Sequence, residues 1–356
     1  MSRFFSRKHE ALEAYVPGEQ PRDQQYVKLN TNESPYPPSP GVAARMAQAR
    51  PLNLYCDIPC TGLRERMAER LDVAPENLLF SNGSDEALNF VFMAYGDAEH
   101  PFVFPDITYG FYTVFGALNN VPYRQIPLGA DFSIDPADYC HAGANVLLAN
   151  PNAPTGMALS PSQIEPVVQS NPDHVVVIDE AYVDFGAESC VPLTKIYDNL
   201  LVVQTFSKSR SLAGARLGFA VGNRALIDDL NTIKYSTNPY NVNSLTQAAG
   251  EAALDEDDYY RANCQKIIRT RENTRTALEA LGFTVLPSQA NFLFARHPAI
   301  SGQRLYERLK ARGVLVRHFT QPAIADYNRI TIGTPEQMDI LLEQTKQILQ
   351  QGEEQP

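Results

Sequence analysis

The stretch SKSRSLAGARLG, from Ser207 to Gly218, follows closely on the branched apolar run Leu200–Val203. Such a run predicts a buried strand of a parallel sheet, and this strand would deliver Lys208 to the carboxyl end of the sheet. Open α/β sheets bind their ligands at that edge. Taken alone, Lys208 is equally compatible with an ordinary exposed lysine. The residues upstream of it favour a functional amine.

The second informative stretch is VVVIDEAYVDF, from Val175 to Phe185. Its four apolar residues predict another buried strand, with the carboxylate of Asp179 at the tip. A carboxylate is seldom buried without a cation or a strong donor beside it. Pyridoxal phosphate requires a lysine for its imine, a carboxylate beside its pyridine nitrogen and an anion site for its phosphate. Lys208 and Asp179 would supply the first two parts.

These stretches resemble, in the same order, motifs of the fold-type I pyridoxal-phosphate-dependent aminotransferases. Within that family the likeness is greatest to the histidinol-phosphate aminotransferases. The motifs that carry the likeness are YVPG at 15–18, LNTNE at 29–33, NPNAPTG at 150–156, DEAY at 179–182, Ser207–Lys208 with Arg216, and RITIGT at 329–334. Because they span nearly the whole chain, the ordered set is far more specific than any one motif.

The resemblance implies an α/β fold, with a mainly parallel, doubly wound sheet in a large domain and a small α+β domain beside it. We expect an N-terminal arm over 1–40 that joins the small domain, a large cofactor-binding domain over 41–257, and a small C-terminal domain over 258–356. A chain of 356 residues is long enough for two domains. The C-terminal part of the chain fits this division, because a long polar helix is predicted from Asp255 to Leu281 and short strands and helices follow it.

Composition excludes several other classes of protein. Hydrophobic residues make up 44% of the chain and charged residues 20%, which is typical of a globular protein. The formal net charge of -11 argues against a general nucleic-acid binder. No apolar leader and no run approaching a membrane span are present, so we expect a soluble cytoplasmic protein. Five scattered cysteines fit a reducing compartment and no metal cluster. No GxGxxG follows an early strand, which argues against a Rossmann dehydrogenase.

A phosphate site is predicted at the start of a helix over Ala87–Tyr95. Ser84 or Asp85 would cap this helix, whose free amide hydrogens attract anions. A plain helix cap is the alternative. The resemblance implies that Gly83, Ser84 and Asp85 cradle the cofactor phosphate, and that Ser207 and Arg216 hold it with them.

Four aromatic or amide positions complete the cofactor site that the resemblance implies. Tyr109, at the start of another predicted helix, would lie on the pyridine face; an exposed tyrosine is the alternative. Tyr55 would reach the cofactor phosphate of a neighbouring subunit, which implies a homodimer. Many aminotransferases have an asparagine directly before Pro-Thr-Gly, where this chain has Ala153. We therefore assign the bond to the cofactor's phenolic oxygen to Asn152, shared with Tyr182.

The substrate site that the resemblance implies is built around two arginines. Arg329 matches the family's carboxylate clamp, and Arg317 matches a second arginine that helps hold a substrate phosphate. A surface ion pair is the alternative for either arginine. Tyr15 and Asn32 belong to an arm that resembles the family's cover over the active-site mouth, and we expect both to contact the substrate.

The reaction that follows from the resemblance is a transamination in histidine biosynthesis. Histidinol phosphate would give its amino group to 2-oxoglutarate, and Lys208 would carry the proton between substrate and cofactor, which requires a partly neutral amine. Threonine-phosphate decarboxylase and aromatic-amino-acid aminotransferase share these motifs and remain alternatives. A non-catalytic cofactor-binding regulator is a third, although such proteins usually carry an added DNA-binding domain.

Overall fold

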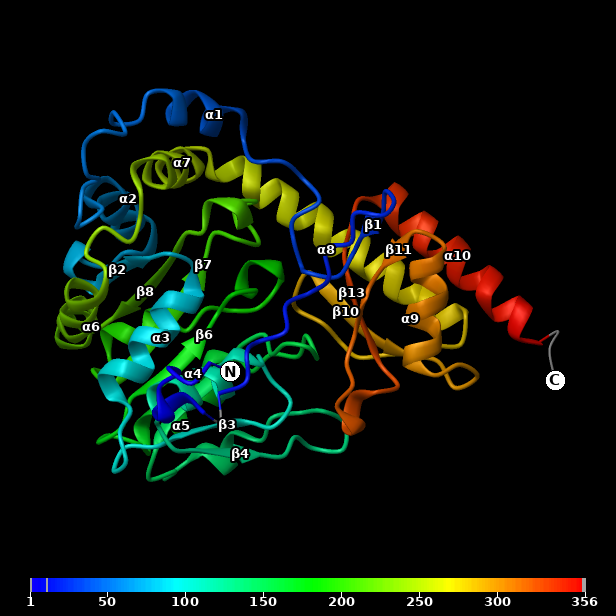
Figure 1. Ribbon diagram of the computed structural model, residues 1–356, viewed down its shortest axis with the longest axis horizontal. Coiled ribbons are helices and arrows are strands. Elements are labelled where there is room, and N and C mark those ends of the chain that lie inside the picture. The colour runs from blue at the N-terminus through cyan, green and yellow to red at the C-terminus, as the bar shows by residue number, and fades with distance from the viewer. Residues whose placement is uncertain (1, 11, 354–356) are drawn as a thin grey trace.

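The computed structural model describes residues 2–10 and 12–353, which form three β-sheets (Figure 1). The largest sheet has seven strands in the order β2-β8-β7-β6-β5-β3-β4. Their bounds are, in that order, Leu78–Ser81, Gly218–Gly222, Leu200–Thr205, Val176–Asp179, Asn145–Ala149, Phe102–Pro105 and Tyr123–Ile126. All neighbouring pairs are parallel except those that β8 makes with β2 and β7. The predicted mainly parallel α/β sheet is confirmed.

Helices cover both faces of this sheet, which is why the central strands β5, β6 and β7 are apolar along most of their length and polar only at or near their ends. Along β5, Val146 and Leu148 belong to one core cluster, and Leu147 and Ala149 belong to the other. A strand buried on both sides loses the polar-apolar alternation of a half-exposed strand. The first face packs against α2 (Thr61–Leu71), α5 (Pro161–Gln169) and α7 (Ser244–Asp255), and the second against α3 (Ser84–Tyr95), α4 (Phe111–Asn119) and α6 (Arg224–Thr237).

A second body lies beside the large sheet and is built mainly from the C-terminal part of the chain (Figure 1). Its antiparallel sheet has the order β12-β13-β10-β9, with bounds Arg317–His318, Asn328–Thr331, Phe292–Arg296 and Thr284–Val285. The N-terminal strand β1 (Val27–Lys28) pairs in parallel with β11 (Val314–Leu315). This pairing attaches the N-terminal segment to the second body. Helices α8 (Asp257–Ala280), α9 (Gly302–Ala311) and α10 (Pro335–Glu353) pack around its core. The exact domain boundaries stay a prediction.

Several helix boundaries differ from those predicted. The helix expected from Asp255 to Leu281 is α8, which begins two residues later, at Asp257, and ends at Ala280; α7 ends at Asp255, with Glu256 non-helical between them. Tyr109 does not begin a helix, since Gly110 precedes the first residue of α4. Helix α1 (Pro40–Ala47) begins with a proline, which suits the first helical position. No described helix is both long and apolar enough to cross a bilayer.

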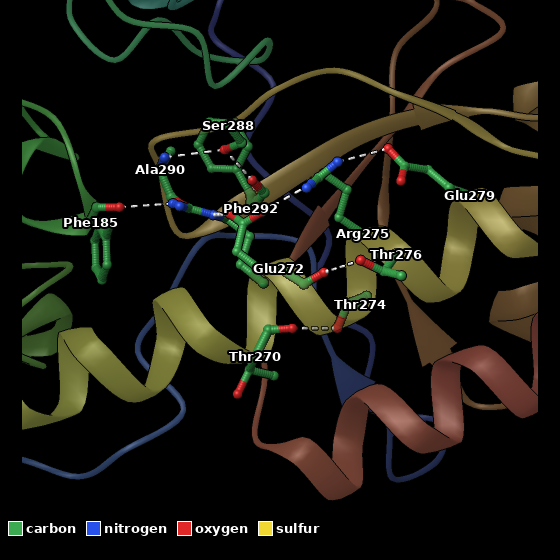
Figure 2. Close-up of polar contacts among 11 residues, drawn as sticks. Phe185, Thr270, Glu272, Thr274, Arg275, Thr276, Glu279, Ser288, Ala290 and Phe292 are labelled. Carbon is green, nitrogen blue, oxygen red and sulfur yellow. Dashed lines mark hydrogen bonds and ion pairs between the residues drawn. The ribbon is translucent and has the colours of Figure 1, made fainter.

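Helix α8 runs from the large sheet to the second body and fixes two loops there (Figure 1). The buried side chain of Arg271 donates to the carbonyl oxygens of Phe185 and Ala290, each at 2.8 Å. The Ser288 hydroxyl accepts from the Ala290 amide at 3.1 Å and donates to the Phe292 carbonyl at 2.6 Å. Figure 2 shows these residues gathered against the helix. The loop before β10 and the segment after β6 are therefore tied to one helix.

Candidate active site

A cavity of about 440 Å³ lies at the carboxyl ends of β5, β6 and β7, and it is closed from the other side by the N-terminal arm and the second body. Most of the predicted site residues line it. They are Tyr15, Asn32, Ser84, Asp85, Tyr109, Asp179, Tyr182, Ser207, Lys208, Arg216, Arg317 and Arg329. Among the described residues, Gly83 lies just behind the wall, while Asn152 and Tyr55 do not reach the cavity.

Lys208 lies in the loop after β7, as predicted, and its amine points into the cavity. The Nζ atom donates to the carbonyl oxygen of Thr31 at 3.1 Å. Burial lowers the pKa of Lys208 to about 8, and the positive charge of Arg329 acts in the same direction. The amine is therefore partly neutral near neutral pH. The two residues after Lys208 anchor this loop. Ser209 contacts Asp184, and Arg210 donates to Asp257 at 2.7 Å.

Asp179 ends β6 and its carboxylate faces the same cavity. Its side chain is buried, and it accepts hydrogen bonds from the Tyr112 hydroxyl at 2.8 Å and the Ala181 amide at 3.2 Å. Burial raises the pKa of Asp179 to about 6, and the Tyr112 hydrogen bond opposes this rise. Tyr112 was not predicted as a site residue. It reaches Asp179 from the first turn of α4, a long-range contact that no local pattern in the sequence signals.

The N-terminus of α3 forms an anion site beside these two groups. Gly83 is the N-cap, with φ +78, and no side chain among the described residues caps the helix. The prediction that Ser84 or Asp85 caps it is therefore wrong, because both already lie within the helix. A Cβ on Gly83 would come within 2.5 Å of the Arg216 guanidinium, so only glycine allows this approach. The free amide hydrogens at the N-terminus of α3 and the guanidinium of Arg216 therefore lie side by side, where both can bind one anion.

Aromatic side chains form the outer wall of the cavity. The Tyr109 hydroxyl donates to Asp85 at 2.8 Å, and Asp85 also accepts from Arg216 at 3.0 Å. Tyr15 stacks on Phe111, with ring centroids 4.1 Å apart, and meets the Tyr109 ring edge-on. Burial raises the pKa of both tyrosines, so both stay protonated. The N-terminal arm therefore lies against the cavity mouth, as expected.

The structure does not bring Asn152 to the cavity. Its amide nitrogen donates to the Ile107 carbonyl at 3.0 Å and to the Thr155 hydroxyl at 3.2 Å, and its amide oxygen accepts from Thr108 at 2.8 Å. The side chain is buried behind the wall, and Ala153 lines the cavity instead. We had assigned the role of the missing asparagine at Ala153 to Asn152, one residue earlier. The Asn152 side chain instead points into the protein, where its hydrogen bonds stabilise the loop.

The two predicted substrate arginines lie opposite each other on neighbouring strands, Arg317 on β12 and Arg329 on β13. Arg329 donates to the Asn30 carbonyl at 3.1 Å, while its Nε is buried and has no partner among the described residues. Burial lowers the pKa of Arg329, which nevertheless stays a cation. Arg317 donates to the carbonyls of Val16 and Pro17, both at 3.2 Å. Arg317 therefore also holds the arm in place.

Tyr55 lies outside the cavity of its own chain, on the surface. Its side chain is 72% exposed and stacks on Tyr240 with ring centroids 4.1 Å apart. Leu52 and Leu54 close by are 75% and 47% exposed. All five cysteines are free thiols, and no cluster of metal-ligating side chains occurs among the described residues.

Comparison with known proteins identifies the family. A family model described as aminotransferase class I and II matches residues 24–344. The chain belongs to this aminotransferase family. A histidinol-phosphate aminotransferase from Brachyspira hyodysenteriae is 48% identical to this aminotransferase over 352 residues, which are 98% of this chain and 99% of that protein.

Two further relatives agree in sequence or in fold. Histidinol-phosphate aminotransferase 1 of Bradyrhizobium diazoefficiens is 50% identical to this aminotransferase over 350 residues, covering 98% of this chain and 100% of that protein. The crystal structure of histidinol-phosphate aminotransferase from Sinorhizobium meliloti, in complex with pyridoxal-5'-phosphate, superposes on this chain with a TM-score of 0.83. It covers 92% of each chain at 23% identity, which supports the fold-type I architecture.

Proposed function

We propose that this aminotransferase uses pyridoxal phosphate to exchange the amino group between histidinol phosphate and 2-oxoglutarate. One observation carries the proposal. A single cavity holds the partly neutral amine of Lys208, the buried carboxylate of Asp179 and the buried guanidinium of Arg329. Relatives about half identical over almost their full length are histidinol-phosphate aminotransferases, which supports the choice of substrate.

The residues present fit pyridoxal phosphate. The uncapped N-terminus of α3 and the guanidinium of Arg216 suit a phosphate, with Ser84, Asp85 and Ser207 beside them on the cavity wall. Tyr109 supplies an aromatic face within the same wall. When bound, the cofactor supplies an electron sink that stabilises negative charge on the substrate's α carbon.

Lys208 is the proposed carrier of the proton that leaves the α carbon. Its Nζ can accept a proton near neutral pH because burial and the charge of Arg329 lower its pKa to about 8. The Thr31 carbonyl orients this amine, since it accepts a hydrogen bond from Nζ at 3.1 Å. The loop anchors at Ser209 and Arg210 keep the amine at the carboxyl end of β7.

Asp179 would hold a negative charge beside the ring nitrogen of the cofactor. A buried carboxylate without a cation is costly, and the pKa of about 6 shows that burial already works against its charge. A cationic ring nitrogen would favour the ionised form. The Tyr112 hydroxyl and the Ala181 amide hold the carboxylate in its orientation from the protein side.

Arg329 and Arg317 are the proposed anion clamp for both substrates. The Nε of Arg329 lacks a partner among the described residues, although an unpaired buried donor costs free energy. A phosphate of histidinol phosphate or a carboxylate of glutamate would satisfy it. Tyr15, which lies between the clamp and Tyr109, would add a hydroxyl donor to the same anion. One clamp can thus serve both half-reactions.

We extend the proposal to a cytoplasmic homodimer. Tyr55, Leu52 and Leu54 expose apolar side chains away from the cavity of their own chain, which suits contact with a second copy. Tyr55 would then reach the cofactor phosphate in that copy. The free cysteines fit a reducing compartment.

The test is a substrate panel with the purified, cofactor-loaded protein. Histidinol phosphate, phenylalanine and threonine phosphate are each supplied with 2-oxoglutarate, and glutamate and carbon dioxide are measured. We expect kcat/KM for histidinol phosphate to exceed that for phenylalanine by about 100-fold or more, since a phosphate can bond both Arg329 and Arg317, whereas the single carboxylate of phenylalanine leaves part of the clamp unpaired. Carbon dioxide release from threonine phosphate, or a preference for phenylalanine, would overturn the substrate assignment.

A further inference from the structure

Asn32 is the most fully engaged polar residue at the cavity, although it was expected to bind substrate. Its amide oxygen accepts from the Thr331 hydroxyl at 3.0 Å, and its backbone amide donates to the same hydroxyl at 3.0 Å. Its carbonyl accepts from the Asn291 side chain at 2.9 Å. The amide nitrogen donates to the Tyr182 hydroxyl at 2.9 Å. These four bonds hold Asn32 from the protein side.

The surrounding structure fixes the direction of the Asn32 side chain. The Thr331 hydroxyl already accepts a bond from the Asn32 backbone, so its own proton goes to the Asn32 amide oxygen. This leaves the amide nitrogen facing Tyr182. Asn291 lies in the loop that Ser288 closes and that α8 holds at Ala290. Figure 2 shows Ser288 and Ala290 beside that helix. Asn32 is therefore held from strand β13, from the segment after β6 and from one braced loop.

Tyr182 is held from its other side by the same loop. Its ring meets Phe292 edge-on, with centroids 5.1 Å apart, and it packs with Ala153 and Ala290. The Tyr182 oxygen accepts its one bond from Asn32, and no acceptor for its proton occurs among the described residues. Since the residue lines the cavity beside Lys208, this proton is free for whatever fills the cavity.

We propose that Asn32 is a positioning residue, whose amide occupies the acceptor side of the Tyr182 hydroxyl and so directs the Tyr182 proton into the cavity. This inference rests on the proposed function, in which the recipient is the phenolic oxygen of pyridoxal phosphate. Neither Asn152 nor Ala153 offers a side-chain amide to the cavity. The Asn152 side chain faces the protein, and the Ala153 side chain is a methyl group. Tyr182 is then the donor on this side, and Asn32 sets its direction.

The test replaces the donor by an acceptor of the same shape. Asn32 has φ +57, a left-handed conformation that aspartate also tolerates, so Asn32→Asp keeps the backbone and the acceptor for Thr331. The introduced carboxylate accepts the Tyr182 proton and turns it away from the cavity. Loss of a donor raises the pKa of a proton held at the phenolic oxygen. We expect the pH midpoint of the cofactor's visible absorbance to rise by about one pH unit or more.

A double-variant comparison separates the hydrogen-bond effect from the added charge. The shift caused by Asn32→Asp is measured in the native protein and in a Tyr182→Phe background, where only the charge remains. We expect the shift in the second background to be less than half of that in the first. Equal shifts in the two backgrounds, or no shift in the native protein, would overturn the positioning role.

Two further proteins keep the experiment decisive. Asn120→Asp makes the same change at an exposed left-handed asparagine outside the cavity, and its midpoint should equal that of the native protein. If Asn32→Asp fails to bind cofactor, Asn32→Gly removes the amide and suits the backbone, and an unchanged midpoint in it would overturn the inference. A native protein that binds no pyridoxal phosphate would instead refute the proposed function.

Discussion

Replacing Tyr112 with phenylalanine should shift the pH dependence of catalysis, because it removes the hydroxyl that stabilises ionised Asp179. The hydroxyl donates to the carboxylate at 2.8 Å, and neither side chain is solvated, with exposures of 0% and 4%. A hydrogen bond to a charged group contributes about 1.5 to 3 kcal/mol. At about 1.4 kcal/mol per pKa unit, its loss should raise the pKa of Asp179 by roughly 1 to 2.

The sign and size of this change follow from the pKa of about 6 that burial gives Asp179. The hydrogen bond favours the charged form, so its removal raises the pKa, to about 7 or 8 in the absence of cofactor. The ionised fraction at pH 7 then falls from about nine-tenths to half or less. A cationic ring nitrogen lowers the pKa in both proteins, which leaves the difference between them.

The assay is the pH profile of kcat/KM, whose acid limb reports ionisations of the free enzyme. The acid limb of Tyr112→Phe should lie about one pH unit or more above that of the native protein. Tyr95→Phe is the matched control, because the Tyr95 hydroxyl donates to the Leu226 carbonyl and does not contact Asp179. Thermal melting checks that both variants fold. A Tyr112→Phe profile that coincides with the native one would refute the reasoning.

Three further changes test the site and the loop that carries it. Lys208→Ala should abolish the covalent attachment of pyridoxal phosphate, and cofactor mass still found on the borohydride-reduced variant by mass spectrometry would refute the lysine assignment. Arg329→Ala should lower kcat/KM for both histidinol phosphate and glutamate by about tenfold or more, whereas unchanged values would place the anion elsewhere. Burial alone would raise the pKa of Asp257, but its Arg70 and Arg210 contacts lower it, so its contribution to stability is present above about pH 4 and is lost as pH falls through the lowered pKa. Asp257→Asn should therefore reduce the free energy of unfolding at pH 7 by roughly 1 to 2 kcal/mol, because solvent partly screens this half-buried group, and should flatten its fall in acid; an unchanged denaturation midpoint would contradict this.

The sequence by itself determined the central sheet and the candidate functional residues that lie at its edge. β5, β6 and β7 are buried on both faces, so they appear in the sequence as continuous apolar runs, and Lys208 and Asp179 follow or end such runs. Ordered motifs then placed most of the cavity-lining residues without coordinates. These signals are local, because each depends on neighbours within one strand or one turn.

Only the tertiary structure decided which polar atoms meet and which way they point. Tyr112 contacts Asp179 across 67 positions of sequence, and Asn32 contacts Thr331 across 299. Such pairs leave no periodic pattern in the chain, so Tyr112 was missed and the contacts that hold Asn32 were not foreseen. Asn152 was assigned by its neighbours in the sequence, yet its amide is used by Ile107 and Thr155. Side-chain direction depends on every polar group that competes for it, and those groups come together only when the chain has folded.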